Sequence, residues 1–411
     1  MNEAPLNYLQ RYVLKHQEEA PGSTMFNLAK MFRLRPGIDL EKLADCLAKA
    51  GRAHQALLTV LHRFEDGEVL QVQGLDEDEI QVEIVRVSER NLLARRASYI
   101  KIFATFDEGL VDAIIFDCGE NAYLLSNIHH LVCDGYSFPL ILEDARRAWN
   151  GEPLEQDHYY DLLARREART KMPVAVAARQ LLVETLKSRD FVTLPRYDFG
   201  GRPGYGSYEV NLDLPESFDS KLDGWKASRH HFFLAATAVA LGRQARANDV
   251  EVDWVFHGRL SKEELRTVGA FMVDLPFVLS DIADKTPGDV ISYTKQATFF
   301  GIKNCHAIKD ADDDPLGGAR TTFVYQDAWG ELMTPGPVDP DGPFAWMIAE
   351  TIPLRPPKIA AENPFNVEIM EHREATRLFV EYDAGRYSEA TVAQFVDCYR
   401  SAMGWLLGGQ S

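Results

Sequence analysis

The segment His129-His130-Leu131-Val132-Cys133-Asp134-Gly135 is the part of this 411-residue chain that says most about its fold. It ends an apolar run that begins at Ala122 and is typical of an interior β-strand. Ser137-Phe138-Pro139 follows, and a hydroxyl residue with an early proline predicts the start of a helix. Because successive side chains of a strand point to opposite faces, only one of the two histidines can face a given cavity.

The residue types in this segment suit acyl transfer. Gly135 permits a backbone conformation or a close approach that a Cβ atom would block, and Asp134 can anchor the turn by accepting hydrogen bonds or by pairing with a distant arginine. The amides of the following helix can favour a negative charge that develops on an attacked carbonyl. A packing role for the histidines is the alternative. The second pair, His230-His231, has no Asp-Gly after it, and we interpret that pair as a helix-start or packing feature.

Composition excludes several classes of function. The formal net charge is −18 without a basic stripe, so a nucleic acid is not expected as a partner. No apolar run reaches the roughly 18 residues of a membrane span, and the N-terminus does not resemble a secretory signal. Five scattered cysteines without a CxxC pair argue against a disulfide framework and a zinc site. These features predict a cytoplasmic protein.

The chain is too long for one typical core and is expected to form two α/β lobes, residues 1–177 and 178–411. Glycine and proline residues gather between 194 and 206, as in linkers and surface loops. Helices are expected from residue 39, from 137, over 161–190 and over 232–245. The expected strands are 26–34, a pair formed by 70–72 and 80–87, a hairpin of 113–116 and 122–130, and then 208–212, 252–256, 272–279, 322–326, 366–371 and 377–382.

The segment 129–137 resembles the HHxxxDG signature of nonribosomal-peptide condensation domains and their relatives, which include epimerisation domains and the carnitine and chloramphenicol acyltransferases. Six further stretches resemble elements of that family, in the family's order along nearly the whole chain. They are 5–10 (PLSPAQ), 54–59 (RHEALRT), 257–259 (ending in Gly-Arg), 267–276 (VGxFVNTLP), 323–327 (FxYQN) and 381–383 (EYDxxLF). Leu58, Val273 and Asp327 depart from these patterns, which bears on substrate preference more than on fold.

The resemblance implies two chloramphenicol-acetyltransferase-like lobes that form a V-shaped pseudo-dimer with a central tunnel. It implies that His130 faces the tunnel as the working residue, while His129 shapes the turn from inside. Asp134 would be structural, in a salt bridge with Arg259 that ties the turn to the second lobe.

The implied reaction is amide-bond formation between a donor acyl or peptidyl thioester and an acceptor aminoacyl thioester. Both substrates would ride on phosphopantetheine arms of donor and acceptor peptidyl carrier proteins, and neither a metal nor a bound cofactor is expected. The protein is expected to act as a monomer.

Three other functions are compatible with the signature. A free-standing relative would form an ester or amide on a small-molecule acceptor. An epimerisation domain would need an acid at the position of Val255 and a glycine at Phe256, and a valine cannot move a proton. A catalytically silent recruitment domain usually lacks the signature histidine, which is present here.

Overall fold

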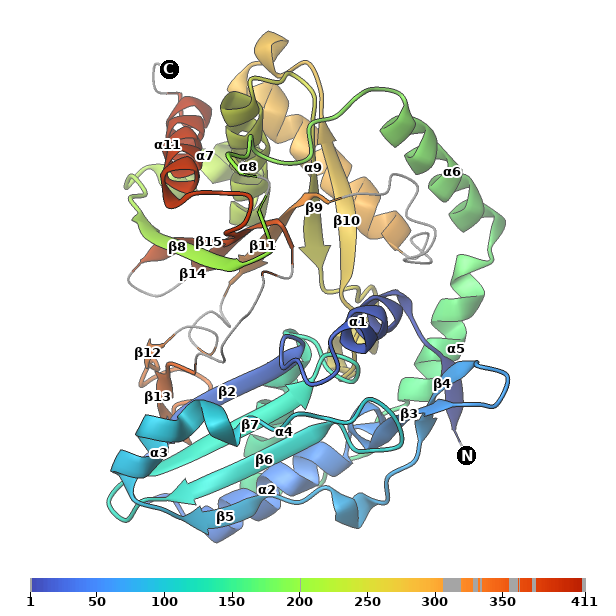
Figure 1. Ribbon diagram of the computed structural model, residues 1–411, viewed down its shortest axis with the longest axis vertical. Coiled ribbons are helices and arrows are strands. Elements are labelled where there is room, and N and C mark those ends of the chain that lie inside the picture. The colour runs from blue at the N-terminus through green and yellow to red at the C-terminus, as the bar shows by residue number, and fades with distance from the viewer. Residues whose placement is uncertain are drawn as a thin grey trace.

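The chain folds into two lobes, each built on a six-stranded sheet that carries helices (Figure 1). This computed structural model describes residues 2–199, 201–305, 319–327, 332, 335–354, 361, 363–371 and 375–408. Among the described residues, no helix combines the length and the apolar character needed to cross a bilayer.

The first lobe contains most of the elements from the first half of the chain. Its sheet has the strand order β12-β13-β2-β7-β6-β5, and a separate three-stranded sheet has the order β1-β4-β3. The elements of this half are β1 (Glu3–Pro5), α1 (Tyr8–Glu19), β2 (Asn27–Leu34), α2 (Leu40–Arg52), β3 (Thr59–Arg63), β4 (Val69–Gln73), β5 (Glu83–Arg86), α3 (Glu89–Arg95), β6 (Val111–Asp117), β7 (Ala122–His129), α4 (Ser137–Trp149), α5 (Tyr159–Thr170) and α6 (Pro173–Lys187).

The second lobe is built on a sheet with the order β10-β9-β11-β14-β15-β8. Its helix α8 packs against α11, and every residue of α8 from Phe232 to Gly242 is buried, which confirms the predicted buried helix. The elements of this half are β8 (Tyr205–Leu212), α7 (Phe218–Trp225), α8 (Arg229–Ala245), β9 (Val250–Phe256), β10 (Val273–Leu279), α9 (Pro287–Asn304), β11 (Thr321–Gln326), β12 (Gly336–Pro337), β13 (Ile348–Ile352), β14 (Phe365–Glu371), β15 (Thr376–Asp383) and α11 (Glu389–Leu406).

The predicted hairpin that leads to the histidines is confirmed. β6 pairs antiparallel with β7, and β7 lies inside the sheet between β6 and β2. Every residue of β7 from Tyr123 to His129 is buried, which explains why this strand is an apolar run rather than an alternating pattern.

Two predictions about strands and helices need correction. The strands near 70–72 and 80–87 do not pair, because β4 pairs with β3 and β1 whereas β5 pairs in parallel with β6 in the larger sheet. The helical stretch 161–190 is two helices, α5 and α6, and Pro173 begins the second because a proline fits the first turn of a helix.

Strands from late in the sequence complete the first sheet. β13 pairs antiparallel with β2, and β12 pairs with β13 at the edge. A salt bridge of 2.8 Å between Arg33 and Glu350 supports this pairing. The division into residues 1–177 and 178–411 stays a proposal; its boundary falls inside α6, and residues 336–352 share the first lobe's sheet.

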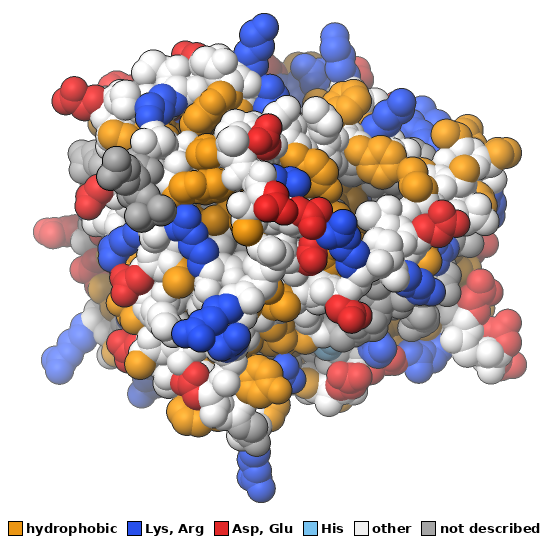
Figure 2. Space-filling model, turned by 90° about the horizontal axis from the view of Figure 1, so that it is seen from above, with side chains coloured by type: hydrophobic (Ala, Val, Ile, Leu, Met, Phe, Trp, Pro, Cys, Tyr) orange, Lys and Arg blue, Asp and Glu red, His pale blue; other side chains and the backbone are white. Residues whose placement is uncertain are grey.

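Figure 2 shows the face of the molecule that is at the top in Figure 1, and this face carries charges of both signs. Lysine and arginine side chains alternate with acidic ones, and hydrophobic side chains lie between them. This face therefore presents no uniform basic patch of the kind that binds nucleic acid.

Candidate active site

The loop after β7 is held by backbone and side-chain hydrogen bonds. The His129 N–H donates to the Leu110 carbonyl at 2.9 Å, and the His130 N–H donates to the Phe26 carbonyl at 2.8 Å. The side-chain amide of Gln10 then donates to the Leu131 carbonyl at 2.7 Å. The start of the loop is thus fixed by contacts with three other parts of the first lobe.

The two histidines have different surroundings. The side chain of His129 is buried, and its Nδ1 accepts a hydrogen bond of 3.2 Å from the Leu131 N–H. Burial, reinforced by the neighbouring His130, lowers the pKa of His129 to about 3. His129 is therefore a neutral packing group that stabilises the turn from inside.

His130 keeps some accessible surface, although protein atoms surround most of its ring. Burial lowers the pKa of His130 to about 4, against the opposing effects of the Asp134 carboxylate and of the Cys133 backbone. Its Nδ1 atom has no hydrogen-bond partner among the described residues. At neutral pH the site thus contains an uncharged imidazole with an unpaired ring nitrogen.

Asp134 forms a buried salt bridge with Arg259 of the second half. Arg259 Nη1 lies 2.8 Å from Asp134 Oδ2, and Nη2 lies 3.1 Å from Oδ1. The carboxylate also accepts from the Ser137 N–H at 2.9 Å and from the Phe271 N–H at 3.0 Å. Burial alone would raise the pKa of Asp134, but Arg259 and these hydrogen bonds hold it below the usual value.

The guanidinium of Arg259 also contacts aromatic rings and backbone carbonyls. It lies over the rings of Tyr136 and Phe271, 4.6 and 4.8 Å from their centroids. It also donates to the His257 carbonyl at 2.9 Å and lies 3.3 Å from the Gly269 carbonyl. The loop between β9 and β10 is thereby docked onto the loop after β7, which joins the two lobes at this point.

Gly258 is required for that docking. Its φ is +71°, and a Cβ atom would lie 1.8 Å from the Phe271 carbonyl oxygen, so only glycine fits. Its own carbonyl accepts a hydrogen bond of 2.6 Å from Arg166 on α5.

Gly135 differs from the expectation in one respect. It is not among the described residues with a positive φ, so an unusual backbone conformation is not the reason for a glycine here. A Cβ atom at this position would meet nothing within 4 Å. The lack of a side chain therefore leaves open space beside the loop, which fits the other expected reason, a close approach by a substrate.

Ser137 has a different role from the predicted one. It is the first residue of α4 rather than its cap, and its N–H donates to Asp134. Its hydroxyl lies 2.8 Å from Asp134 Oδ1 and accepts from the Gly269 N–H at 3.0 Å and from Arg259 at 2.7 Å. Asp134 satisfies a free amide of the helix, and Ser137 joins the buried network.

Sequence reasoning missed two residues near the start of α1 that hold the site. Asn7 Nδ2 donates to the Ala270 carbonyl at 2.6 Å, while Gln10 reaches the loop after β7 and shares a hydrogen bond of 3.0 Å with Gln71. Both residues lie in the stretch 5–10 that resembles a family element. That resemblance was the available signal, but it did not say which groups they bind.

His257 is a second imidazole near the loop. Its ring stacks on Tyr136 at 4.8 Å, and its Nδ1 accepts from the Arg259 N–H at 3.2 Å. Burial and the charge of Arg259 lower its pKa. His257 begins the stretch 257–259 that resembles a family element, but the sequence does not show that its ring lies beside this loop, because that position depends on how the two lobes meet.

The pair His230-His231 is a packing feature, as predicted. His231 closes a capping box with Ser228 at the start of α8. His230 packs against the rings of Trp254 and Phe323 at 4.9 and 5.7 Å.

Comparisons with known proteins agree with this geometry. The family model for the condensation domain matches residues 1–299. The chain is 25% identical over 286 residues to a plipastatin synthase polypeptide of Bacillus subtilis (strain 168), covering 65% of this chain and 11% of that protein. It is 22% identical over 316 residues to surfactin synthase subunit 1 of the same bacterium, covering 74% of this chain and 8% of that one. The chain therefore spans about a tenth of the length of these relatives.

Solved structures share the fold over nearly the whole chain. The condensation domain of the monacolin K polyketide synthase MokA matches with a TM-score of 0.78 and 18% identity, covering 98% of this chain and 97% of that one. The first condensation domain of the calcium-dependent antibiotic synthetase, in complex with a substrate analogue, matches with a TM-score of 0.76 and 17% identity over 98% and 96%. The epimerization domain from the third module of a tyrocidine synthetase gives 0.71 and 19% over 98% of each.

At these identities the solved structures establish the fold alone, which is the predicted two-lobed α/β fold. The family assignment rests on the match over 299 of the 411 residues. The chain belongs to the condensation-domain family.

Proposed function

We propose that the chain forms an amide bond between a donor acyl or peptidyl thioester and an acceptor aminoacyl thioester. The observation that carries this proposal is the neutral imidazole of His130, which keeps some accessible surface on a loop held by the buried pair of Asp134 and Arg259. Membership of the family and the similarity to synthase polypeptides support it.

In this reaction the acceptor amine attacks the carbonyl carbon of the donor thioester. The C–N bond forms, the C–S bond breaks, and the proton lost by the amine leaves with the released thiol. A free α-amine has a pKa of about 7.7–8.0, so a useful fraction is already neutral at cellular pH. Holding both groups at attack distance is then worth up to roughly 7–11 kcal/mol.

The pKa of His130, about 4, favours a positioning role. Such an imidazole is a weak base and is uncharged at pH 7, so it orients the amine by accepting a hydrogen bond, and the proton lost by the amine passes to the departing thiolate. His129, Asp134 and Arg259 support it as positioning residues, and Gly135 leaves room for the substrate.

The substrates would arrive on phosphopantetheine arms of donor and acceptor peptidyl carrier proteins, through a tunnel between the lobes. The chain itself would need neither a metal nor a bound cofactor, and it would act as a cytoplasmic monomer in natural-product biosynthesis.

The test is a mass-spectrometric assay of transfer between two loaded carrier proteins, with short thioester mimics as a second substrate pair. We expect amide product from the wild type, a loss of roughly 10²-fold in His130→Ala because the amine is no longer positioned, and full activity in His62→Ala. The last variant is a matched control, because His62 is partly exposed on β3 and pairs with Asp107.

Other outcomes assign other functions. Transfer to an alcohol but not to an amine would place the chain in the ester-forming branch, and solvent deuterium at Cα without transfer would indicate epimerisation. Unchanged activity in His130→Ala would refute the role given to this residue.

A further inference from the structure

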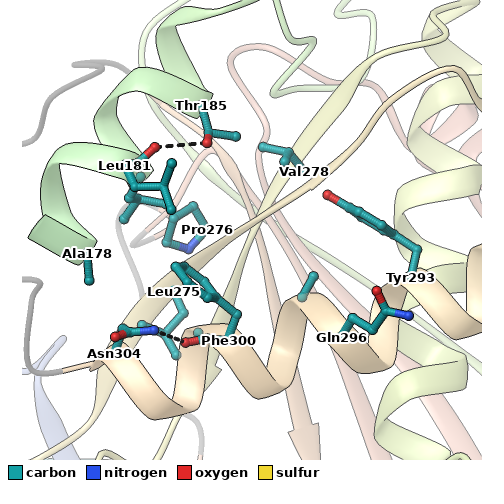
Figure 3. Close-up of a pocket in the computed structure, with 13 residues that line it drawn as sticks. Ala178, Leu181, Thr185, Leu275, Pro276, Val278, Tyr293, Gln296, Phe300 and Asn304 are labelled. Carbon is teal, nitrogen blue, oxygen red and sulfur yellow. Dashed lines mark hydrogen bonds between the residues drawn. The ribbon is translucent and has the colours of Figure 1, made fainter.

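A cavity of about 340 Å³ lies between α6, β10 and α9, away from the histidine loop (Figure 3). Neither a residue of the segment 129–137 nor Arg259 lines it. Its volume falls within the range of small-molecule sites, which is about 300–1,000 Å³. The cavity is therefore a candidate binding site that the proposed reaction does not use.

The cavity is an elongated groove. From Tyr293 to Asn304, one face of α9 lines it at helical spacing, and α6 lines it from Ala178 to Thr185. With a rise of 1.5 Å per residue, these stripes make the groove roughly 10–16 Å long. Pro276 of the edge strand β10 lies between the two helices, as Figure 3 shows.

Small side chains create the space. Ala178 on α6 and Ala297 and Gly301 on α9 line the cavity, where larger residues would fill it. Large apolar side chains stand at its rim instead, since Leu181 is 53% exposed and Phe300 is 41% exposed. Exposed apolar groups around a hollow are typical of a ligand-binding groove.

The polar groups of the lining are unevenly distributed. Thr185 donates to the Leu181 carbonyl, and Asn304 donates to the Phe300 carbonyl, each at 2.9 Å within its own helix. Tyr293 and Gln296 lie one turn apart on α9, and no hydrogen bond joins either side chain to another described residue. These two side chains provide free hydrogen-bonding groups at one end of an apolar groove.

The described lining of the cavity contains no lysine, arginine, aspartate or glutamate. A ligand that carries a carboxylate would therefore find no cation in that lining, and it would also meet a protein whose formal net charge is −18. An uncharged polar group suits the tyrosine hydroxyl and the glutamine amide, which both donate and accept hydrogen bonds.

We propose that this groove binds a neutral amphiphile, with an aliphatic chain between α6 and α9 and an amide, ester or alcohol group at Tyr293 and Gln296. The aliphatic chain covers the exposed faces of Leu181 and Phe300. The site is separate from the histidine loop, so it does not depend on the proposed amide-forming activity.

The test is calorimetric titration of the full chain with octanamide, compared with octanoate. We expect octanamide to bind and octanoate to bind roughly tenfold more weakly, because the carboxylate loses water without gaining a cation. Tyr293→Phe should weaken octanamide binding about fivefold, because it removes one hydrogen-bonding group.

Two further variants separate filling of the groove from a general effect. Ala178→Trp fills the groove and should abolish binding, whereas Ala177→Trp places the same side chain on an exposed position of α6 that does not line the cavity and should bind as the wild type does. Ala297→Leu fills the groove from the other wall and replaces Ala178→Trp if that variant does not fold. The proposal is overturned if the wild type gives no binding heat up to the solubility limit of octanamide, if the filled variants bind like the wild type, or if octanoate binds as tightly.

Discussion

Replacing Asp134 with alanine should destabilise the fold as well as slow the reaction. The variant removes the partner of Arg259, whose side chain has no exposed surface, and leaves the N–H groups of Ser137 and Phe271 without their acceptor. Three backbone carbonyls near the guanidinium remain, but none carries a full charge. Removing one member of a buried ion pair costs about 3–5 kcal/mol, and we expect a loss of that size in the free energy of unfolding.

Urea denaturation followed by tryptophan fluorescence measures this loss. Glu209→Ala is the matched control, because it breaks a pair with Arg377 in which both side chains are partly exposed, and it should cost less than about 1 kcal/mol. Asp134→Ala combined with Arg259→Met should recover part of the stability, since the orphaned charge is gone. An Asp134→Ala protein that is inactive but as stable as the control variant would refute the structural role and place the carboxylate in the chemistry.

Three further predictions concern the pH dependence of stability, the pH dependence of the rate, and the open space beside Gly135. Burial lowers the pKa of His54, but the carboxylates of Asp144 and Asp157, 3.3 and 3.2 Å from its ring nitrogens, raise it above 6.5 overall. Its contribution to stability is therefore complete below about pH 6.5 and is lost as the pH rises through the folded-state pKa. The urea midpoint should therefore fall with rising pH in this range, and a His54→Gln variant with the same slope would contradict this. Because the pKa of His130 is about 4, the rate of amide formation should follow deprotonation of the acceptor amine near pH 7.7–8.0, and a rate limb near 6.5 that His130→Gln abolishes would argue against a neutral positioning role. Gly135→Ala should unfold at the same urea concentration as the wild type, since its Cβ meets nothing within 4 Å, and should lower kcat/KM at least several-fold; unchanged kcat/KM would show that the substrate does not use this space.

Local patterns were sufficient for the elements that carry the histidines. The apolar run of β7, the break between β6 and β7 and the apolar helix α8 each have a signature within about twenty residues of sequence. These elements are buried on most sides, so hydrophobicity and secondary structure point to the same result.

Local sequence patterns could not predict which strands pair when the strands are far apart in the sequence. β13 lies beside β2 although more than 300 residues separate them, and nothing in either strand names its partner. The wrong pairing of 70–72 with 80–87 has the same origin. The two stretches are close in sequence, which favoured a hairpin, but β4 pairs with β3 and β1 instead.

The candidate site divides in a similar way. The resemblance supplied Asp134 and Arg259, which lie 2.8 Å apart in the structure. It did not supply the backbone groups that hold them, namely the Phe271 N–H and the Gly269 carbonyl. Backbone donors and acceptors are the same in every residue, so a sequence carries no signal for the ones that a fold brings together.

The same network explains why a weakly basic histidine suffices in the proposed reaction. A residue whose pKa is about 4 contributes little by removing a proton, so its effect depends on how accurately it places the amine. Accuracy requires a rigid support, and the loop of His130 receives one from α1 through Gln10 and from the second lobe through Arg259. Any change that lets the two lobes separate at Asp134 should therefore lower the rate even when His130 is intact. The imidazole is then chemically unchanged, but it is no longer held where it can orient the amine.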